Sequence, residues 1–188
     1  VEGNSSGFGL KKIGIEIGSN NHIIVDKNGK TNLDNIYAVG DVIGPPWLAH
    51  VSSSEGLYVV EHIAKLSPKK IDYDCVPACT YSKPEIGSIG LSQKILDERG
   101  IDYKVVKSFF NANGKAVASD STEGFIKILV SDRNQILGAH IIGSNATEMI
   151  SEFSLAMSNN LSVENILDSI HPHPTFSEAI FETLMQLR

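Results

Sequence analysis

Alternating apolar and polar positions dominate the middle of the chain. Short runs of this kind, rich in Val, Ile and Phe and bounded by turn residues, predict β-strands. Turn residues at positions 132–134 separate the last two runs and favour an antiparallel pairing, so the region is expected to form a mainly antiparallel sheet. The predicted strands cover residues 76–81, 86–90, 103–110, 124–130 and 135–142, and a short helix at residues 92–99 ends at Gly100.

The pattern changes to a helical one in the last third. Between residues 146 and 157, apolar residues recur at three- and four-residue steps, which predicts an amphipathic helix. Asn145 is its expected N-cap, with Glu148 as the acid at the third position. Ser162 is expected to cap a second helix at residues 163–170, and a third should follow the Thr-Phe-Ser-Glu segment at 175–178 and run to about residue 186.

The first 70 residues have a third pattern. Residues 12–25 predict brief strands and turns, and the apolar run at residues 36–39 predicts a strand that stops at Gly40-Asp41. A proline-rich loop and an amphipathic helix follow. The helix's expected apolar stripe consists of Leu48, Val51, Leu57, Val60, Ile63 and Ala64.

A linker with the sequence SPKK ends at residue 70 and suggests a domain boundary there. We therefore expect an α/β unit at residues 1–70 and an α+β domain at residues 71–188. The chain opens VEGNSSGFG, without an initiator Met or a strand-plus-glycine signal, so it is expected to start within a domain.

Charge and hydropathy exclude two classes of partner. The formal net charge is −6, so there is no Lys/Arg surplus to bind a phosphate backbone, and we expect no nucleic acid partner. No apolar run approaches the roughly 20 residues that span a bilayer, and no leader pattern opens the chain. We expect a soluble, cytosolic protein.

Two cysteines, Cys75 and Cys79, lie four residues apart around Pro77. In extended backbone their Cα atoms would be roughly 13 Å apart, beyond the roughly 7 Å limit for a disulfide. Their spacing does not fit zinc patterns either. We expect two reduced thiols.

The segment HPHPTFSE at residues 171–178 carries the strongest chemical signal. A residue before proline is extended and proline's own φ is fixed, so both histidines should sit on a stiff arm. Glu178 could reach back to an imidazole nitrogen of His173 and make a general acid-base pair. It could instead cap the helix through the Thr175 amide, and spacing alone favours the cap. A metal site is disfavoured because the two imidazoles, which extended backbone would place on one side, have no third ligand nearby.

A second candidate site is the strand end at Gly40 and Asp41. Glycine there lets a ligand approach the backbone, and the aspartate can accept hydrogen bonds from hydroxyl groups. The following helix would point its N-terminus toward the same ligand. A capped strand end in an ordinary α/β unit is the alternative. The chain contains no complete dinucleotide-binding motif.

Taken together, the segments resemble the dihydrolipoamide dehydrogenases, flavoproteins of the pyridine nucleotide-disulfide oxidoreductase family. The likeness covers nearly the whole chain and rests on the order IYAVGDV, GPPWLAH, EG, VPACTYSKPEIGSIGLS, YKVVKSFFNANGKA, GFIKI, ILGAHIIGSNATEMI and HPHPTFSEA. The resemblance implies the C-terminal part of an FAD-binding domain at residues 1–70 and an interface domain that completes a homodimer at residues 71–188.

The resemblance also assigns roles to residues. His173 would be the acid-base that serves the thiols of the opposite subunit's active site, and Glu178 would orient it. Asp41, with Gly40, would hold FAD. Leu48, Ala49 and His50 would mark the helix start that faces the flavin. The implied reaction oxidises protein-bound dihydrolipoamide with NAD+ through a redox disulfide and FAD.

Other implications concern partners and missing parts. The expected partners are a second subunit and the lipoyl domain of a 2-oxo acid dehydrogenase or glycine cleavage complex, in the bacterial cytoplasm or mitochondrial matrix. The family's redox cysteines, phosphate-binding glycines and NAD+ site lie outside the matching segments, so the isolated chain is expected to be inactive with only a partial FAD site. A glutathione or mercuric reductase type of enzyme, or a dimerisation module without catalysis, are the alternatives.

Overall fold

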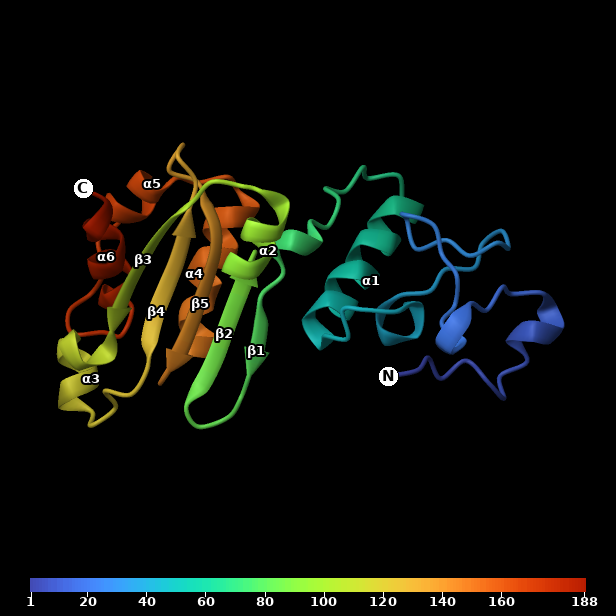
Figure 1. The fold of residues 1–188 in the computed structure, drawn as a ribbon. Coiled ribbons are helices and arrows are strands. Elements are labelled where there is room, and N and C mark those ends of the chain that lie inside the picture. Colours follow the sequence, from blue (N-terminus) through green and yellow to red (C-terminus); the bar gives the residue numbers. More distant parts are fainter. The chain divides into compact units, whose positions relative to one another are not determined.

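A computed structural model describes residues 1–188, which divide into two compact units, Val1–Ile71 and Asp72–Arg188. All five strands belong to the larger unit, and the smaller unit contains one α-helix, α1 (Figure 1). No helix is both long and apolar enough to cross a membrane.

The larger unit is built on a five-stranded antiparallel sheet. Its strands lie in the order β1-β2-β5-β4-β3, and every neighbouring pair is antiparallel. The predicted α+β class is therefore confirmed, and each strand lies within two residues of its predicted bounds. The strands are β1 (Ala78–Thr80), β2 (Glu85–Gly90), β3 (Lys104–Phe109), β4 (Phe125–Val130) and β5 (Ile136–Gly143).

Two helices cover one face of this sheet. α4 (Ala146–Ser158) packs on β2 and β5, and α6 (Glu178–Leu184) packs on β3 and β4 (Figure 1). Gly87 lets α4 approach closely, because a Cβ there would lie 2.5 Å from the Ala146 carbonyl oxygen. The remaining elements of this unit are η4 (Tyr73–Cys75), α2 (Gln93–Arg99), η5 (Phe110–Ala112), α3 (Gly114–Ala118), α5 (Val163–Leu167) and η6 (Met185–Leu187).

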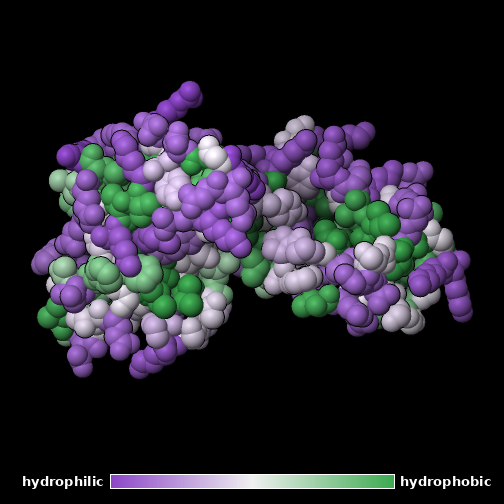
Figure 2. All heavy atoms as spheres, viewed as in Figure 1, coloured by the Kyte–Doolittle hydropathy of each residue, from purple (hydrophilic) through white to green (hydrophobic).

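The core lies between the sheet and these helices. Along β4, Ile126 and Ile128 point into it and are fully buried, and Phe153 of α4 meets them from the other side. Each such side chain contributes roughly 1.5–3 kcal/mol when it leaves water. The opposite face of the sheet exposes Val105 and Phe109, and Figure 2 shows hydrophobic atoms gathered on this face.

Helix ends in this unit follow the sequence signals with two exceptions. Ser92 caps α2 through the Ile95 amide, and Gly100 ends it with a left-handed φ of 62°, as predicted. α5 stops at Leu167, before the predicted residue 170. There the Ser169 amide donates to the Ile166 carbonyl, and its hydroxyl donates to an earlier carbonyl, which tightens and closes the last turn.

The second exception is the start of α4, where Asn145 is the N-cap by position, as predicted, but not through its side chain. Asn145 has a left-handed φ of 62° and its side chain makes no cap bond, whereas an N-cap residue normally has extended backbone. Glu85 of β2 serves instead. Its carboxylate accepts the Thr147 amide at 3.1 Å and the Thr147 hydroxyl at 2.7 Å.

The smaller unit contains η1 (Leu10–Ile13), η2 (Ser19–Asn21), η3 (Gly40–Ile43) and α1 (Ala49–Ile63). The predicted strand at residues 36–39 is not formed, and Tyr37 makes only an isolated bridge to Lys30. A strand needs a neighbour along its whole length to accept and donate hydrogen bonds. Residues 1–71 provide no such neighbour.

The predicted apolar stripe of α1 is also wrong in part. Its buried positions are Val51, Glu55 and Val59, while Leu57 and Val60 are about two-thirds exposed at 66% and 65%. Apolar residues lie on more than one side of this helix, so its sequence does not single out one face. The packing of η3 selects the buried face.

Candidate active site

The HPHP segment forms an irregular strap between α5 and α6, which we define as residues 169–177. The chain bends at His173 and Pro174. His171 is buried, with 9% of its side chain exposed, whereas His173 is 77% exposed. The expectation that both imidazoles lie on one side is wrong, because that rule holds for extended strands and the strap bends. The structure contains no group of three potential metal ligands.

Glu178, the first residue of α6, contacts His173. Its Oε1 lies 2.8 Å from His173 Nδ1, and its Oε2 accepts the Thr175 amide at 2.8 Å. The acid-base pair and the helix cap were alternatives in the sequence, and the carboxylate makes both contacts with its two oxygens. These contacts lower the pKa of Glu178, through the Thr175 amide first and the His173 imidazole second.

Three contacts fix the turn that follows His173. The Thr175 hydroxyl donates to the Pro172 carbonyl at 2.7 Å. Phe176 is buried and packs edge-on against Phe110, with ring centroids 6.0 Å apart. The buried Asn113 donates from Nδ2 to the Thr175 carbonyl at 3.1 Å.

Sequence reasoning missed Asn113. It lies 62 residues before Thr175, and its Oδ1 also accepts the Ala116 amide as the N-cap of α3. The NGKA sequence signals that cap, since Asn is a favoured N-cap residue. The bond to the strap has no local signal.

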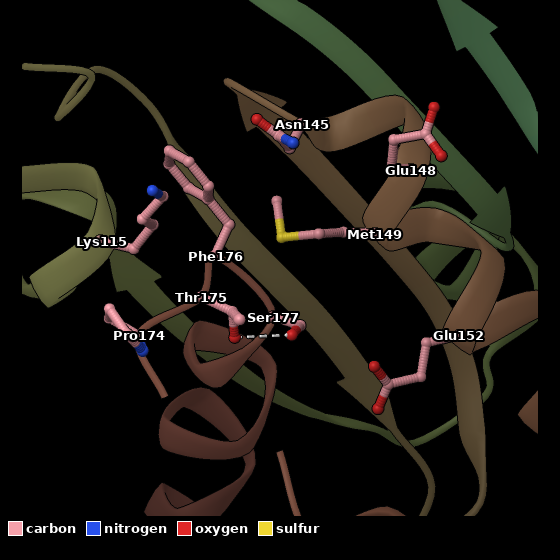
Figure 3. A pocket seen from close by; sticks show the side chains of 9 residues that line it. All are labelled: Lys115, Asn145, Glu148, Met149, Glu152, Pro174, Thr175, Phe176 and Ser177. Carbon is pink, nitrogen blue, oxygen red and sulfur yellow. Dashed lines mark hydrogen bonds between the residues drawn. The ribbon is translucent and has the colours of Figure 1, made fainter. Parts of the chain in front are cut away.

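This arrangement suits proton transfer by His173. A carboxylate on Nδ1 fixes the tautomer and orientation of the ring, which leaves Nε2 as the nitrogen that faces a bound molecule. The ring is exposed, so a thiol or hydroxyl from another chain can reach it. A pocket of about 360 Å³ opens beside the strap, between α3, α4 and residues 174–177 (Figure 3).

The second predicted cluster lies in the smaller unit. Gly40 has a φ of 77°, and its amide donates to Glu55 Oε2 at 2.6 Å. A Cβ at Gly40 would lie 2.7 Å from Ser52 Oγ, so the loop packs tightly on α1. Asp41 follows in η3 with an exposed side chain.

The other three residues of this cluster mark the start of α1. Leu48 is its N-cap, and Ala49 and His50 form its first turn with exposed side chains. The structure therefore brings the Gly40-Asp41 loop onto the helix that begins with them. Glu55, which fixes the loop, was missed as an individual residue, although its EG dipeptide is among the segments that carry the family resemblance.

The cysteines are not joined to each other in a disulfide. Cys75 donates to the Asp72 carboxylate at 3.4 Å, and Cys79 lies in β1 with its sulfur 4.0 Å from the Thr147 carbonyl. Burial raises the pKa of the Cys79 thiol, and Glu85 raises it further. Neither observation describes an activated thiolate.

Family profiles match most of the chain. The dimerisation domain of the pyridine nucleotide-disulphide oxidoreductases matches residues 76–184, and a second profile, described as pyridine nucleotide-disulphide oxidoreductase, matches residues 1–56.

Curated relatives agree with these profiles. The mitochondrial dihydrolipoyl dehydrogenase of Caenorhabditis elegans is 41% identical over 95% of this chain and 36% of its own length. The mitochondrial dihydrolipoyl dehydrogenase of Sus scrofa is 44% identical over 93% of the chain and 34% of its length. The dihydrolipoyl dehydrogenase of Rhizobium etli is 39% identical over 98% of the chain and 39% of its length. The chain thus spans little more than a third of these relatives.

Solved structures share the fold. LpdA from Mycobacterium tuberculosis superposes with a TM-score of 0.93 and is 27% identical, over all of this chain and 41% of its own. The HOCl-induced flavoprotein disulfide reductase RclA from Escherichia coli, as a Cu(II) complex, gives a TM-score of 0.92 and 25% identity, over all of this chain and 43% of its own.

Proposed function

This chain belongs to the pyridine nucleotide-disulfide oxidoreductase family, and on that premise we propose that it is part of a dihydrolipoamide dehydrogenase in which His173 is the acid-base. The observation that carries the proposal is the contact of 2.8 Å between His173 Nδ1 and Glu178 Oε1, made on an exposed ring. The identities of about 40% to dihydrolipoyl dehydrogenases support the choice of substrate class.

The proposed chemistry begins with a proton transfer. His173 Nε2 removes a proton from a thiol of dihydrolipoamide bound at the opposite subunit, and Glu178 stabilises the imidazolium that forms. The resulting thiolate attacks one sulfur of the enzyme's redox disulfide, forms a mixed disulfide and releases the other sulfur as a thiolate. Cys75 and Cys79 take no part in this proposal.

The smaller unit would hold one part of FAD. Asp41 offers a carboxylate to the hydroxyl groups of the cofactor, Gly40 lets this loop pack on α1, and Leu48, Ala49 and His50 present the positive end of α1. The exposed Asp41 side chain and the tight loop at Gly40 fit such a site. Bound FAD would supply the redox chemistry between the thiols and NAD+.

The same proposal covers domains and partners. Residues 1–70 would complete an FAD-binding domain, and residues 71–188 would form the interface domain of a homodimer. The lipoyl domain of a 2-oxo acid dehydrogenase or glycine cleavage complex would deliver the substrate. The relatives come from mitochondria and from a bacterium, which points to the mitochondrial matrix or the bacterial cytoplasm as the compartment.

The test joins this chain to the upstream part of a closely related dihydrolipoamide dehydrogenase. Flavin absorbance and lipoamide:NAD+ turnover are measured for the fusion, for its His173→Gln variant and for the chain alone. We expect a yellow, active fusion whose turnover falls roughly 10²- to 10⁴-fold in the variant, since that is the usual contribution of a general acid-base. We expect the chain alone to be colourless and inactive.

Other outcomes would favour different functions. A flavin-containing fusion that turns over equally well without His173 rules out the proposed mechanism. Reduction of glutathione disulfide or Hg²⁺ in preference to lipoamide oxidation would identify a related reductase instead. An inactive fusion that still dimerises would leave only a pairing role.

A further inference from the structure

The strap holds a second histidine-carboxylate contact besides the proposed catalytic pair. His171 Nε2 lies 2.9 Å from Glu152 Oε1, and the imidazole is buried while that of His173 is exposed. The two pairs use carboxylates from different helices, since Glu152 belongs to α4 and Glu178 to α6. The His171–Glu152 pair therefore fixes the strap to a helix that the His173–Glu178 pair does not touch.

The His171 ring also contacts α6. Its centroid is 6.0 Å from that of Phe181, and the two planes are tilted by 48°. The core holds both helices rigidly, because Phe153 of α4 and Ile180 of α6 are fully buried. The His171 ring contacts both helices, so it attaches the beginning of the strap to α4 and α6.

The end of the strap is fixed independently. Asn113 holds the Thr175 carbonyl, and Phe176 is buried in the core. His173 lies between His171 and Thr175, which are the attachment points at the beginning and the end of the strap. Figure 3 shows the carboxylate of Glu152 pointing from α4 toward the strap, across the pocket that residues 174–177 line.

The chemistry of His171 indicates why an imidazole is there. Its Nδ1 is buried and has no hydrogen-bond partner in the structure. An apolar side chain would fill the same space without leaving a polar nitrogen unpaired, which costs free energy in a protein interior. What the imidazole adds is a directional hydrogen bond to Glu152. Such a bond fixes the orientation of the strap on α4 as well as its position.

We propose that His171 and Glu152 are a positioning pair, whose contact holds the strap so that the His173 ring stays in place on Glu178. The proposal rests on the acid-base role of His173 and goes beyond it by assigning the residues that set its geometry. Neither His171 nor Glu152 transfers a proton in this account. A small displacement of a reacting group can lower a rate by about 10²-fold, so such a contact affects turnover strongly.

Three variants distinguish the effect of the His171–Glu152 hydrogen bond from the effect of packing at residue 171. His171→Leu keeps apolar volume and removes the donor. His171→Gln returns an amide donor at similar reach, and Glu152→Ala removes the acceptor from a partly exposed site on α4 where the core is not disturbed. Melting temperatures identify any variant that fails to fold, and Glu152→Ala then replaces His171→Leu in the comparison.

The first readout is nitrogen-15 NMR of the imidazoles in the 188-residue chain. Glu178→Gln supplies the reference spectrum for a weakened His173 contact. We expect the His173 signals in His171→Leu and Glu152→Ala to move toward that reference, and those in His171→Gln to stay near the unsubstituted chain. His173 signals that do not move in His171→Leu or Glu152→Ala would overturn the proposal.

The second readout is turnover in the fused enzyme. We expect kcat to fall about tenfold or more in His171→Leu, with KM changed less than about twofold, and to recover in His171→Gln. Full turnover in His171→Leu, with His173→Gln inactive, rejects the positioning pair and leaves the proposed function intact. Full turnover in His173→Gln rejects both, so the two failures are distinguishable.

Discussion

Glu178 combines two contacts that a short sequence motif presents as alternatives. A carboxylate has two oxygens with lone pairs in different directions, so one can accept the Thr175 amide while the other meets His173. The first contact places the start of α6, and the second orients an imidazole. The same residue therefore couples helix geometry to the candidate active site.

This coupling makes stability depend on pH in a defined direction. The folded state lowers the pKa of Glu178 below its ordinary value near 4.5, so its contribution is present above that value and is lost as the pH falls through the lowered pKa. We expect Glu178→Gln to be less stable than the unsubstituted chain at pH 7, with the difference shrinking below about pH 4.5. Urea unfolding followed by circular dichroism at a series of pH values measures it. A difference that stays constant down to pH 3 would contradict the stated linkage.

Asn113 also makes two contacts, and its side chain is buried. It caps α3 through Ala116 and holds the strap through Thr175. Asn113→Ala should cost about 2–3 kcal/mol, because a cap and a buried bond are lost together. Ser92→Ala, which removes only the cap of α2, is the control and should cost about 1 kcal/mol. Equal losses in denaturant unfolding would show that the strap contact adds nothing.

At the scale of elements, α4 depends on a residue from another element. Its first amides are unpaired within the helix, and Glu85 of β2 accepts one of them at Thr147. The helix is thereby joined to the strand on which it packs. Local sequence could not indicate this, since Glu85 lies 62 residues before Thr147.

The cap gives a prediction about two acids near the start of α4. Glu85→Ala should destabilise the chain by about 1–2 kcal/mol, because the Thr147 amide and hydroxyl lose their acceptor. Glu148→Ala removes an acid in the first turn and should cost under about 1 kcal/mol, since that is the usual size of an interaction with the helix dipole. Chemical denaturation of both variants measures the difference. A larger effect at Glu148 would show that the acid in the first turn stabilises α4 more than the contact with Glu85 does.

For the whole molecule, the match of residues 76–184 to a dimerisation domain predicts self-association. We expect multi-angle light scattering to give a discrete species of twice 20.3 kDa at micromolar concentration. His173→Gln should leave this mass unchanged, because the side chain is exposed and outside the core. A monomer at all concentrations would contradict the prediction, and a polydisperse aggregate would indicate non-specific burial of apolar surface.

The sequence by itself determined the strands and most of the helices of the larger unit, but not its short helix α3 or the order of its strands. Alternation with a period of two located every strand within two residues, and the Ser92 and Gly100 signals located the ends of α2. These are local properties, because side-chain direction and helix capping depend on residues a few positions apart. The HPHPTFSE motif likewise contained both partners of the candidate pair within six residues.

The tertiary structure decided whatever joins distant segments. Whether residues 36–39 form a strand, and which face of α1 is buried, depends on neighbours that the local pattern does not contain. For the same reason Glu85, and not the Asn145 side chain, accepts a first-turn amide of α4. His171 and His173 are each followed by proline, but their environments differ. The strap bends, so the His171 ring contacts Glu152 while the His173 ring contacts Glu178 and is exposed.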